Sequence, residues 1–147
     1  MKKLNILFIC RANCFRSKVA EAYFNRINKN KNIKAKSAGV VAGYRQGDFQ
    51  VEAAKELGIN IKGKSRGINA NLLKWTDILV DVADDVPAEI FDYEKKRGII
   101  KYLIVWNIKD VKTTRDIDDD KRVIRQVMEK VNKLNKQLEN LRQNGNS

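Results

Sequence analysis

The sequence predicts an α/β fold with one open sheet of four parallel strands joined by crossover helices. Four short apolar segments have the composition of buried strands, at residues 4–9, 33–38, 77–82 and 99–106. Segments with helical periodicity alternate with them, as expected when parallel strands are joined by crossover helices. The chain has 147 residues, of which 43% are hydrophobic, which is enough for one domain with its own core.

The helices follow the strands in order, and two of them have clear end signals. Asp48 can cap a helix over 49–57 that stops at Gly58, and Pro87 lies in the first turn of a helix over 87–94. Further helices are predicted at 18–27, at 69–75 and after residue 116. We predict a single domain over residues 1–143, without repeats or linkers, and a frayed tail at 144–147.

The last helix has an apolar seam whose hydrophobic residues alternate three and four apart, from Ile124 to Leu141. Such a seam can form a coiled-coil contact between two copies of a chain. It can also cover one face of its own sheet, which we favour because the seam is shorter than a sustained coiled coil requires. We therefore expect a monomer or a weak dimer.

Composition limits the chemistry and the compartment. The chain has no histidine, the usual general base and the commonest metal ligand. Its two cysteines lie close together and do not form the disulfide framework of a secreted domain. There is no apolar run of about 18 residues and no signal-peptide pattern. We expect a cytoplasmic protein that needs no metal or other cofactor and has no membrane partner.

The formal net charge is +12, which favours anionic partners, nucleic acid among them. Lysines are spread along the whole chain rather than gathered in one segment. Scattered lysines on a solvated surface therefore explain the charge better than a nucleic-acid-binding face.

The most informative segment is residues 10–17, between the first strand and the first helix. Cys10 ends the strand, and after five intervening residues Arg16 and Ser17 open the helix. A loop that enters a helix offers backbone N–H groups and the positive end of the helix dipole to an anion. The same field favours the thiolate of a nearby cysteine, and an arginine can grip two phosphate oxygens. Asn13 tolerates the left-handed backbone that a tight anion-binding loop needs.

This segment, read as C-x5-R-S after a hydrophobic strand, resembles the phosphate loop of the low-molecular-weight protein tyrosine phosphatases. Other segments match that family in the same order. They are Ala-Glu-Ala at 20–22, Ser-Ala-Gly at 37–39, the helix followed by Gly-Ile at 53–59, Ser-Arg at 65–66, and 105–110, which ends in the family's acidic residue.

The resemblance implies a three-layer, flavodoxin-like sheet with strand order 2-1-3-4 and helices on both faces, and a two-step phosphoryl transfer. Cys10 would attack phosphorus and form a phosphocysteine, Arg16 would hold the phosphate, and Asp110 would act as general acid and then general base. The partners would be a phosphotyrosine protein or a small phosphomonoester, with inorganic phosphate as product. The remaining residues expected to bind substrate or phosphate are Arg11, Ala12, Asn13, Cys14, Phe15, Ser17 and Tyr44.

The loop departs from the family pattern at several positions. Ala12 stands where the family has glycine and would be strained if that site needs a positive φ. The family's second cysteine precedes the arginine directly, whereas here Phe15 does and Cys14 lies one position earlier. Whether Cys10 and Cys14 form a disulfide is open. Arg11 adds a positive charge at the rim.

The acid and the aromatic wall each have more than one candidate. Asp110 is followed by Val111 instead of proline, and the tyrosines that usually come next are absent. Tyr44 or Trp106 can replace them, or either can belong to the core. The acidic residues 116 and 118–120 can be N-terminal charges of the last helix, and we favour Asp110 because it lies on the loop.

Three further functions compete with a phosphatase. Arsenate reductases share the fold, but their relay through thioredoxin needs late cysteines, and no cysteine follows Cys14. A non-catalytic protein that binds phosphate or phosphoproteins is a second possibility, because of Ala12 and the missing proline. A nucleic-acid-binding domain is the third.

Overall fold

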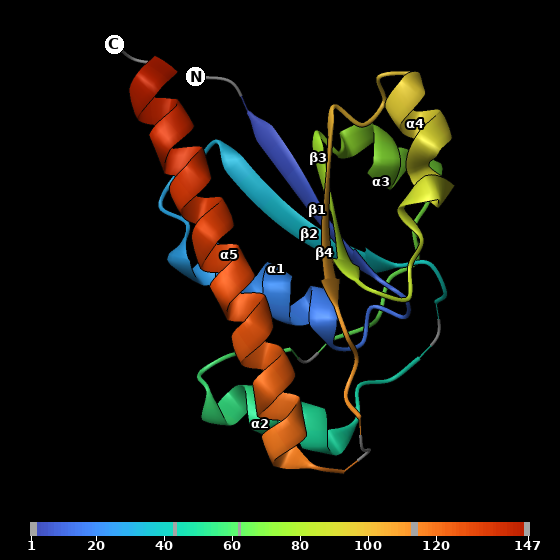
Figure 1. Cartoon of the computed structure of the whole chain (residues 1–147), viewed down its shortest axis with the longest axis vertical. Coiled ribbons are helices and arrows are strands. Elements are labelled where there is room, and N and C mark those ends of the chain that lie inside the picture. Colours follow the sequence, from blue (N-terminus) through green and yellow to red (C-terminus); the bar gives the residue numbers. More distant parts are fainter. Residues whose placement is uncertain (1–2, 43, 62, 113–114, 146–147) are drawn as a thin grey trace.

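Four parallel strands form a single sheet in the order β2-β1-β3-β4 (Figure 1). The computed structural model describes residues 3–42, 44–61, 63–112 and 115–145. The strands are β1 (Leu4–Cys10), β2 (Ile33–Gly39), β3 (Ile78–Ala83) and β4 (Tyr102–Ile108). The predicted fold class and strand order are confirmed.

The helices are α1 (Arg16–Ile27), α2 (Asp48–Glu56), α3 (Ala70–Trp75), the 3-10 helix η1 (Ala88–Phe91), α4 (Asp92–Lys96) and α5 (Ile117–Gly145). Figure 1 shows α1, α2 and α5 gathered on one side of the sheet and α3 and α4 on the other. α5 extends into the segment predicted to fray, whose last two residues lie outside the described ranges. The predicted domain boundary stays a prediction.

Two predicted elements differ from the structure. The helix predicted over 87–94 is η1 followed by α4, because a 3-10 turn precedes the first α-helical turn. The strand predicted over 99–106 begins only at Tyr102. Residues Ile99 and Ile100 instead donate their backbone N–H groups to the Glu94 carbonyl oxygen, so they close the end of α4.

A third difference concerns the start of α2. Asp48 is its first residue rather than its cap, and Gly47 holds the cap position. The Gly47 N–H donates to Gln50 Oε1 over 3.2 Å, which closes the end of the helix.

Side chains of successive strand residues alternate between two hydrophobic cores, as the pleat of a strand requires. Ile6 and Phe8 face the core beneath α1 and α5, whereas Leu7 and Ile9 face the core beneath α3 and η1. β1 is therefore buried on both faces, which explains its unbroken apolar sequence.

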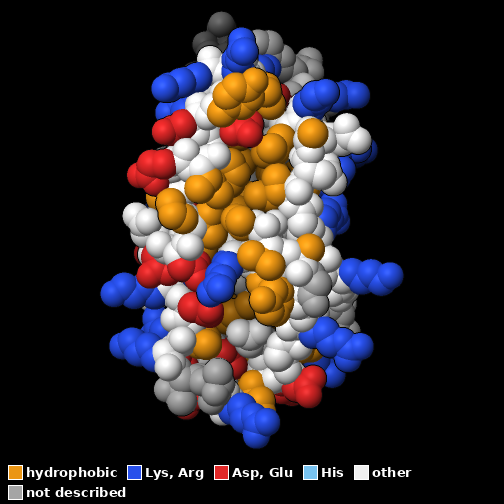
Figure 2. Space-filling view, turned by 90° about the vertical axis from the view of Figure 1, so that its right-hand side faces the viewer, with side chains coloured by type: hydrophobic (Ala, Val, Ile, Leu, Met, Phe, Trp, Pro, Cys, Tyr) orange, Lys and Arg blue, Asp and Glu red, His pale blue; other side chains and the backbone are white. Residues whose placement is uncertain are grey.

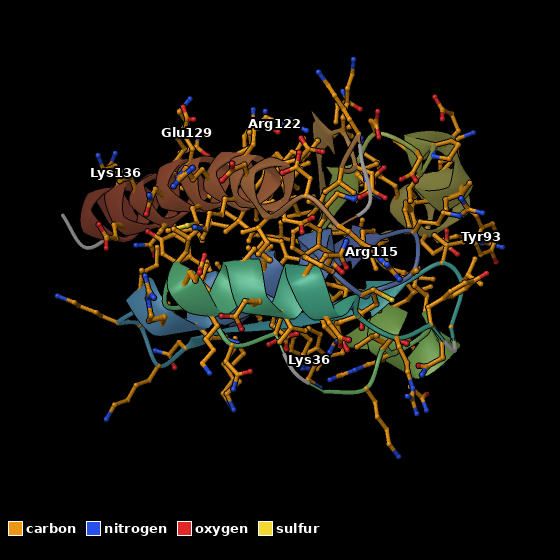
Figure 3. All side chains as sticks on the ribbon, turned by 90° about the horizontal axis from the view of Figure 1, so that it is seen from below. Lys36, Tyr93, Arg115, Arg122, Glu129 and Lys136 are labelled. Carbon is orange, nitrogen blue, oxygen red and sulfur yellow. The ribbon has the colours of Figure 1, made fainter. Side chains whose placement is uncertain are left out.

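The apolar seam of α5 is buried within the chain, as we favoured. Val127 and Val131 are fully buried in the core shared with α1, while Leu141 near the end is exposed. Arg122, Glu129 and Lys136 project from α5 away from the packed interior (Figure 3). The described residues include no helix long and apolar enough to cross a membrane.

Candidate active site

All four strands end at the same edge of the sheet, and the loops that follow them meet there. Val40 and Val41 after β2 donate their backbone N–H groups to the carbonyl oxygens of Cys10 and Arg11. The Ile108 carbonyl at the end of β4 accepts a hydrogen bond from Arg16. This edge, beside the strand where the order reverses, is the usual ligand site of an open parallel sheet.

Cys10 ends β1 with its thiol almost fully buried and surrounded by hydrogen-bond donors. The backbone N–H of Asn13 points at the sulfur over 3.2 Å, and Ser17 Oγ lies 2.9 Å from it. Asn13 has φ +54°, the left-handed conformation that asparagine tolerates. Ala12 is not among the described residues with positive φ, so the predicted strain is absent.

Gly39 lets the loop pack this closely against β2. A Cβ atom at Gly39 would lie 2.7 Å from both the carbonyl carbon of Ala12 and the backbone nitrogen of Asn13. Such distances are too short for non-bonded atoms, so a side chain at this position would push the loop over residues 11–15 away from the sheet. The glycine of the Ser-Ala-Gly sequence therefore has a steric role here.

The Asn13 amide ties the loop to its surroundings through neutral hydrogen bonds. Asn13 Nδ2 donates to Ser17 Oγ over 2.8 Å and to Ser37 Oγ over 2.9 Å, and Asn13 Oδ1 accepts from the Arg66 N–H over 2.8 Å. Ser37 in turn donates to Glu21. Because Ser17 accepts from Asn13, its own hydroxyl hydrogen is free to point at the Cys10 sulfur.

Arg16 is buried, and its guanidinium group is surrounded by oxygen atoms. Nη1 donates to the Ile108 carbonyl over 2.9 Å and lies 3.5 Å from Asp84 Oδ1. Nη2 lies 3.1 and 3.3 Å from the two carboxylate oxygens of Asp85 and 3.7 Å from Asp110 Oδ2. The ionic partners of this arginine thus come from the ends of β3 and β4.

A cavity of about 260 Å³ opens over the loop, and both the thiol and the proposed acid line it. Tyr44 is 56% exposed and belongs to the lining, whereas Trp106 packs on Phe8 with ring centroids 5.7 Å apart. Of the two aromatic candidates, only Tyr44 faces the site. The lining consists of Cys10, Arg11, Ala12, Cys14, Phe15, Arg16, Tyr44, Gln50, Asp85 and Asp110.

The competing acidic residues lie at the start of α5 instead. Asp116 Oδ1 accepts hydrogen bonds from the backbone N–H groups of Asp118 and Asp119, as the side chain of an N-cap residue does. Asp110 lies on the loop after β4, and its Oδ1 accepts the Val111 N–H over 2.8 Å. Of these carboxylates, Asp110 alone belongs to the cavity lining.

Cys14 lies at the rim as a free thiol, as Cys10 is in the base. Burial, with the nearby Cys10 and Asp110, raises the pKa of Cys14, and the positive charge of Lys18 only partly offsets this. The Cys14 sulfur contacts the Ala12 carbonyl oxygen over 3.5 Å. Cys14 therefore stays a neutral thiol near neutral pH.

Asp81 is a fully buried carboxyl group in β3, level with Ile9 of the neighbouring strand. Neither of its oxygens has a partner with normal hydrogen-bond geometry among the described residues. Burial, followed by the negative charge of Asp85, raises the pKa of Asp81 to about 7, although Arg16 opposes the shift. This carboxyl is therefore protonated in mildly acidic solution.

The structure gives a place in the site to residues for which the sequence predicted no role there, although Glu21, Ser37 and Arg66 belong to segments that match the family. Asp85 and Gln50 line the cavity, and Ser37, Glu21 and Arg66 support the loop from outside. A signal existed for Asp85, because it lies two residues after the end of a buried strand, at the edge where ligands bind. No group of three or more Cys, Asp or Glu side chains in the described ranges is arranged to hold a metal ion.

Comparison with known proteins connects this geometry to a family. A family model described as "Low molecular weight phosphotyrosine protein phosphatase" matches residues 5–146. No curated protein matches the sequence significantly.

Several solved structures share the fold. A YwlE mutant from Bacillus subtilis is 25% identical, with a TM-score of 0.79 over 93% of this chain and 99% of that one. An arsenate reductase from Archaeoglobus fulgidus is 28% identical, with a TM-score of 0.67 over 88% and 98%. The YwlE arginine phosphatase from Geobacillus stearothermophilus is 18% identical, with a TM-score of 0.78 over 96% of both chains, and shows the fold alone.

Proposed function

Because the chain belongs to the low molecular weight phosphotyrosine protein phosphatase family and is a cysteine-based phosphatase, we propose that Cys10 is its nucleophile, Arg16 its phosphate clamp and Asp110 its general acid and base. One observation carries this assignment. The Cys10 thiol, the Arg16 guanidinium group and the Asp110 carboxylate, from the ends of β1, α1 and β4, line one cavity above a loop whose N–H groups can face an anion.

In the first step the Cys10 thiolate attacks phosphorus and forms the S–P bond while the bond to the leaving oxygen breaks. Asp110 gives its proton to that oxygen, and Arg16 with the loop N–H groups stabilises the equatorial oxygens. In the second step water attacks phosphorus, its proton goes to Asp110, and the S–P electron pair returns to sulfur. The Ser17 hydroxyl lies 2.9 Å from the sulfur and can donate to it, so it stabilises the thiolate in both steps.

We propose phosphotyrosine in proteins as the first substrate to test, with small phosphomonoesters as model substrates and inorganic phosphate as product. The family description supports this choice, and Tyr44 supplies an exposed ring at the cavity wall against which a substrate ring can stack. The two free thiols suit a reducing compartment such as the cytoplasm.

Phosphoarginine is a second candidate, because two carboxylates face the cavity. Asp85 and Asp110 can pair with a cationic guanidinium leaving group, which a tyrosine does not have. A solved arginine phosphatase has the same fold. Initial rates on a phosphotyrosine peptide and on a matched phosphoarginine peptide decide between the two.

An arsenate reductase, a binding-only protein and a nucleic-acid-binding domain have less support. Among the described residues Cys14 is the only thiol besides Cys10, and no later cysteine exists for a reductase relay. A binding-only role is disfavoured, because the loop carries the thiol with its donors in place. On the face shown in Figure 2, acidic side chains are interspersed with basic ones around a central hydrophobic area, which does not favour a nucleic-acid surface there.

The decisive experiment is p-nitrophenyl phosphate hydrolysis by the wild type, Cys10→Ser and Asp110→Ala, with Asp118→Ala as the control. We expect no activity for Cys10→Ser, a strong loss for Asp110→Ala and wild-type rates for Asp118→Ala, an exposed carboxylate outside the cavity. Activity that survives Cys10→Ser would refute the mechanism. Equal rates for the two Asp variants would refute the role of Asp110.

A further inference from the structure

The two nitrogen ends of the Arg16 guanidinium group have different surroundings. Nη1 contacts the Ile108 carbonyl oxygen and Asp84, neither of which lines the cavity. Nη2 contacts Asp85 and Asp110, which both do. Nη2 therefore faces the cavity and is the end that a phosphate in the cavity would reach.

Asp85 already occupies that end. Its two carboxylate oxygens lie 3.1 and 3.3 Å from Nη2, so both share the donor that a phosphate oxygen requires. Carboxylates and phosphates bind guanidinium groups with the same geometry, and both are anions. A phosphate and the Asp85 carboxylate cannot hold this position together, and two anions side by side repel each other.

We propose that the Asp85 carboxylate competes with phosphate groups for Arg16 Nη2. This competition weakens the binding of both the substrate and the product phosphate, and so sets the affinity of the site. The proposal rests on the proposed function, because it assumes that phosphate binds at Arg16. A positioning role for Asp85 makes the opposite prediction. If Asp85 held Arg16 in the geometry that phosphate needs, removing its carboxylate would weaken phosphate binding. The sign of the change separates the two.

Asp84 provides a matched control. It is the preceding residue, carries the same charge and contacts the same guanidinium group, through Nη1 at 3.5 Å. Its side chain is 36% exposed, compared with 38% for Asp85. Because Asp84 does not line the cavity, Asp84→Asn removes a similar charge without freeing the phosphate position.

The test is the dissociation constant of inorganic phosphate, measured by titration calorimetry on the full chain at fixed ionic strength. We expect Asp85→Asn to bind phosphate about tenfold more tightly, Asp85→Glu to remain near the wild type, and Asp84→Asn to change less than threefold. The KM for p-nitrophenyl phosphate and the inhibition constant for phosphate should fall together in Asp85→Asn.

Unchanged or weaker phosphate binding in Asp85→Asn would overturn the proposal, as would equal tightening in Asp84→Asn. Asp85→Ser serves as a second variant if Asp85→Asn does not fold, which circular dichroism reveals. The binding measurement needs no turnover, so it is separate from the test of the nucleophile. If Cys10→Ser stayed active while Asp85→Asn bound phosphate more tightly, the assignment of Cys10 would fail and the role of Asp85 would stand.

Discussion

The two sides of the phosphate loop are held by different interactions. On the Asn13 side the bonds link buried, mostly neutral groups, and every polar atom of the Asn13 side chain has a partner. On the Arg16 side one buried guanidinium group faces three carboxylates, whose side chains are 36%, 38% and 55% exposed. One side is closed and satisfied, while the other opens to the cavity.

This difference separates the fixed part of the site from the part that a ligand can rearrange. Breaking a buried neutral bond leaves an unsatisfied group in the interior and costs stability. A charged contact beside the cavity can instead be exchanged for a similar contact with phosphate. We therefore expect changes on the Asn13 side to act mainly on folding and changes on the Arg16 side to act mainly on activity.

The largest expected effect is a loss of activity on the Arg16 side. Arg16→Lys keeps the charge but loses the planar fork, so kcat/KM for p-nitrophenyl phosphate should fall about a hundredfold to a thousandfold. Arg26→Lys, at an exposed contact with the Gly58 carbonyl, is the control and should retain its activity. Near-normal kcat/KM in Arg16→Lys would contradict the clamp role.

The next largest effect is a loss of stability on the Asn13 side. Asn13→Ala removes three hydrogen bonds and places alanine at φ +54°, so the free energy of unfolding should fall by about 2–4 kcal/mol. Urea unfolding measures this change, and Asn13→Gly, which tolerates the backbone angle, should lose less. If Asp84→Ala cost as much stability as Asn13→Ala, the proposed division between the two sides would be wrong.

A smaller effect concerns Asp81, the buried carboxyl group in β3. Its pKa is about 7 in the folded chain and near 3.8 in the unfolded chain, so between these values the folded state keeps a proton that the unfolded state releases. The Asp81 contribution to stability therefore decreases as pH rises from about 4 to 7. Relative to the wild type, Asp81→Asn should gain about 2–3 kcal/mol between pH 5 and pH 8.

Thermal or urea unfolding of both chains at several pH values measures this difference. Burial also raises the pKa of Asp120, to about 6, but this group is present in both chains and its effect cancels. A stability difference that stays constant from pH 5 to pH 8 would show that Asp81 does not titrate in this range.

The smallest effect is expected at Cys14, at the rim between the two sides. Because its pKa is raised, iodoacetamide at pH 7 should label Cys14 slowly, and labelling should accelerate above pH 9. Peptide mass spectrometry of a Cys10→Ser background measures this without interference from the proposed nucleophile. Cys14→Ser should change kcat/KM less than about threefold. Rapid labelling of Cys14 at pH 7 would contradict the raised pKa.

Much of the fold could be predicted because its signals are local. The apolar run before Cys10 and the polar turn after it lie within a few neighbouring residues, so periodicity was enough to place β1 and the loop. The start of β4 was predicted too early, because Ile99 and Ile100 have strand composition but complete the end of α4. Composition does not reveal where a backbone N–H finds its acceptor.

By itself the sequence determined the order of strands and helices along the chain, the thiol at the end of β1 and the arginine at the start of α1. These features depend on the hydrophobic periodicity of neighbouring residues. Only the tertiary structure decided which distant side chains reach that loop. Asp84 and Asp85 pair with Arg16 across 68 and 69 residues of chain, and Tyr44 rather than Trp106 faces the cavity. Contacts between distant residues depend on how the segments pack, and packing is settled only when the whole core has formed.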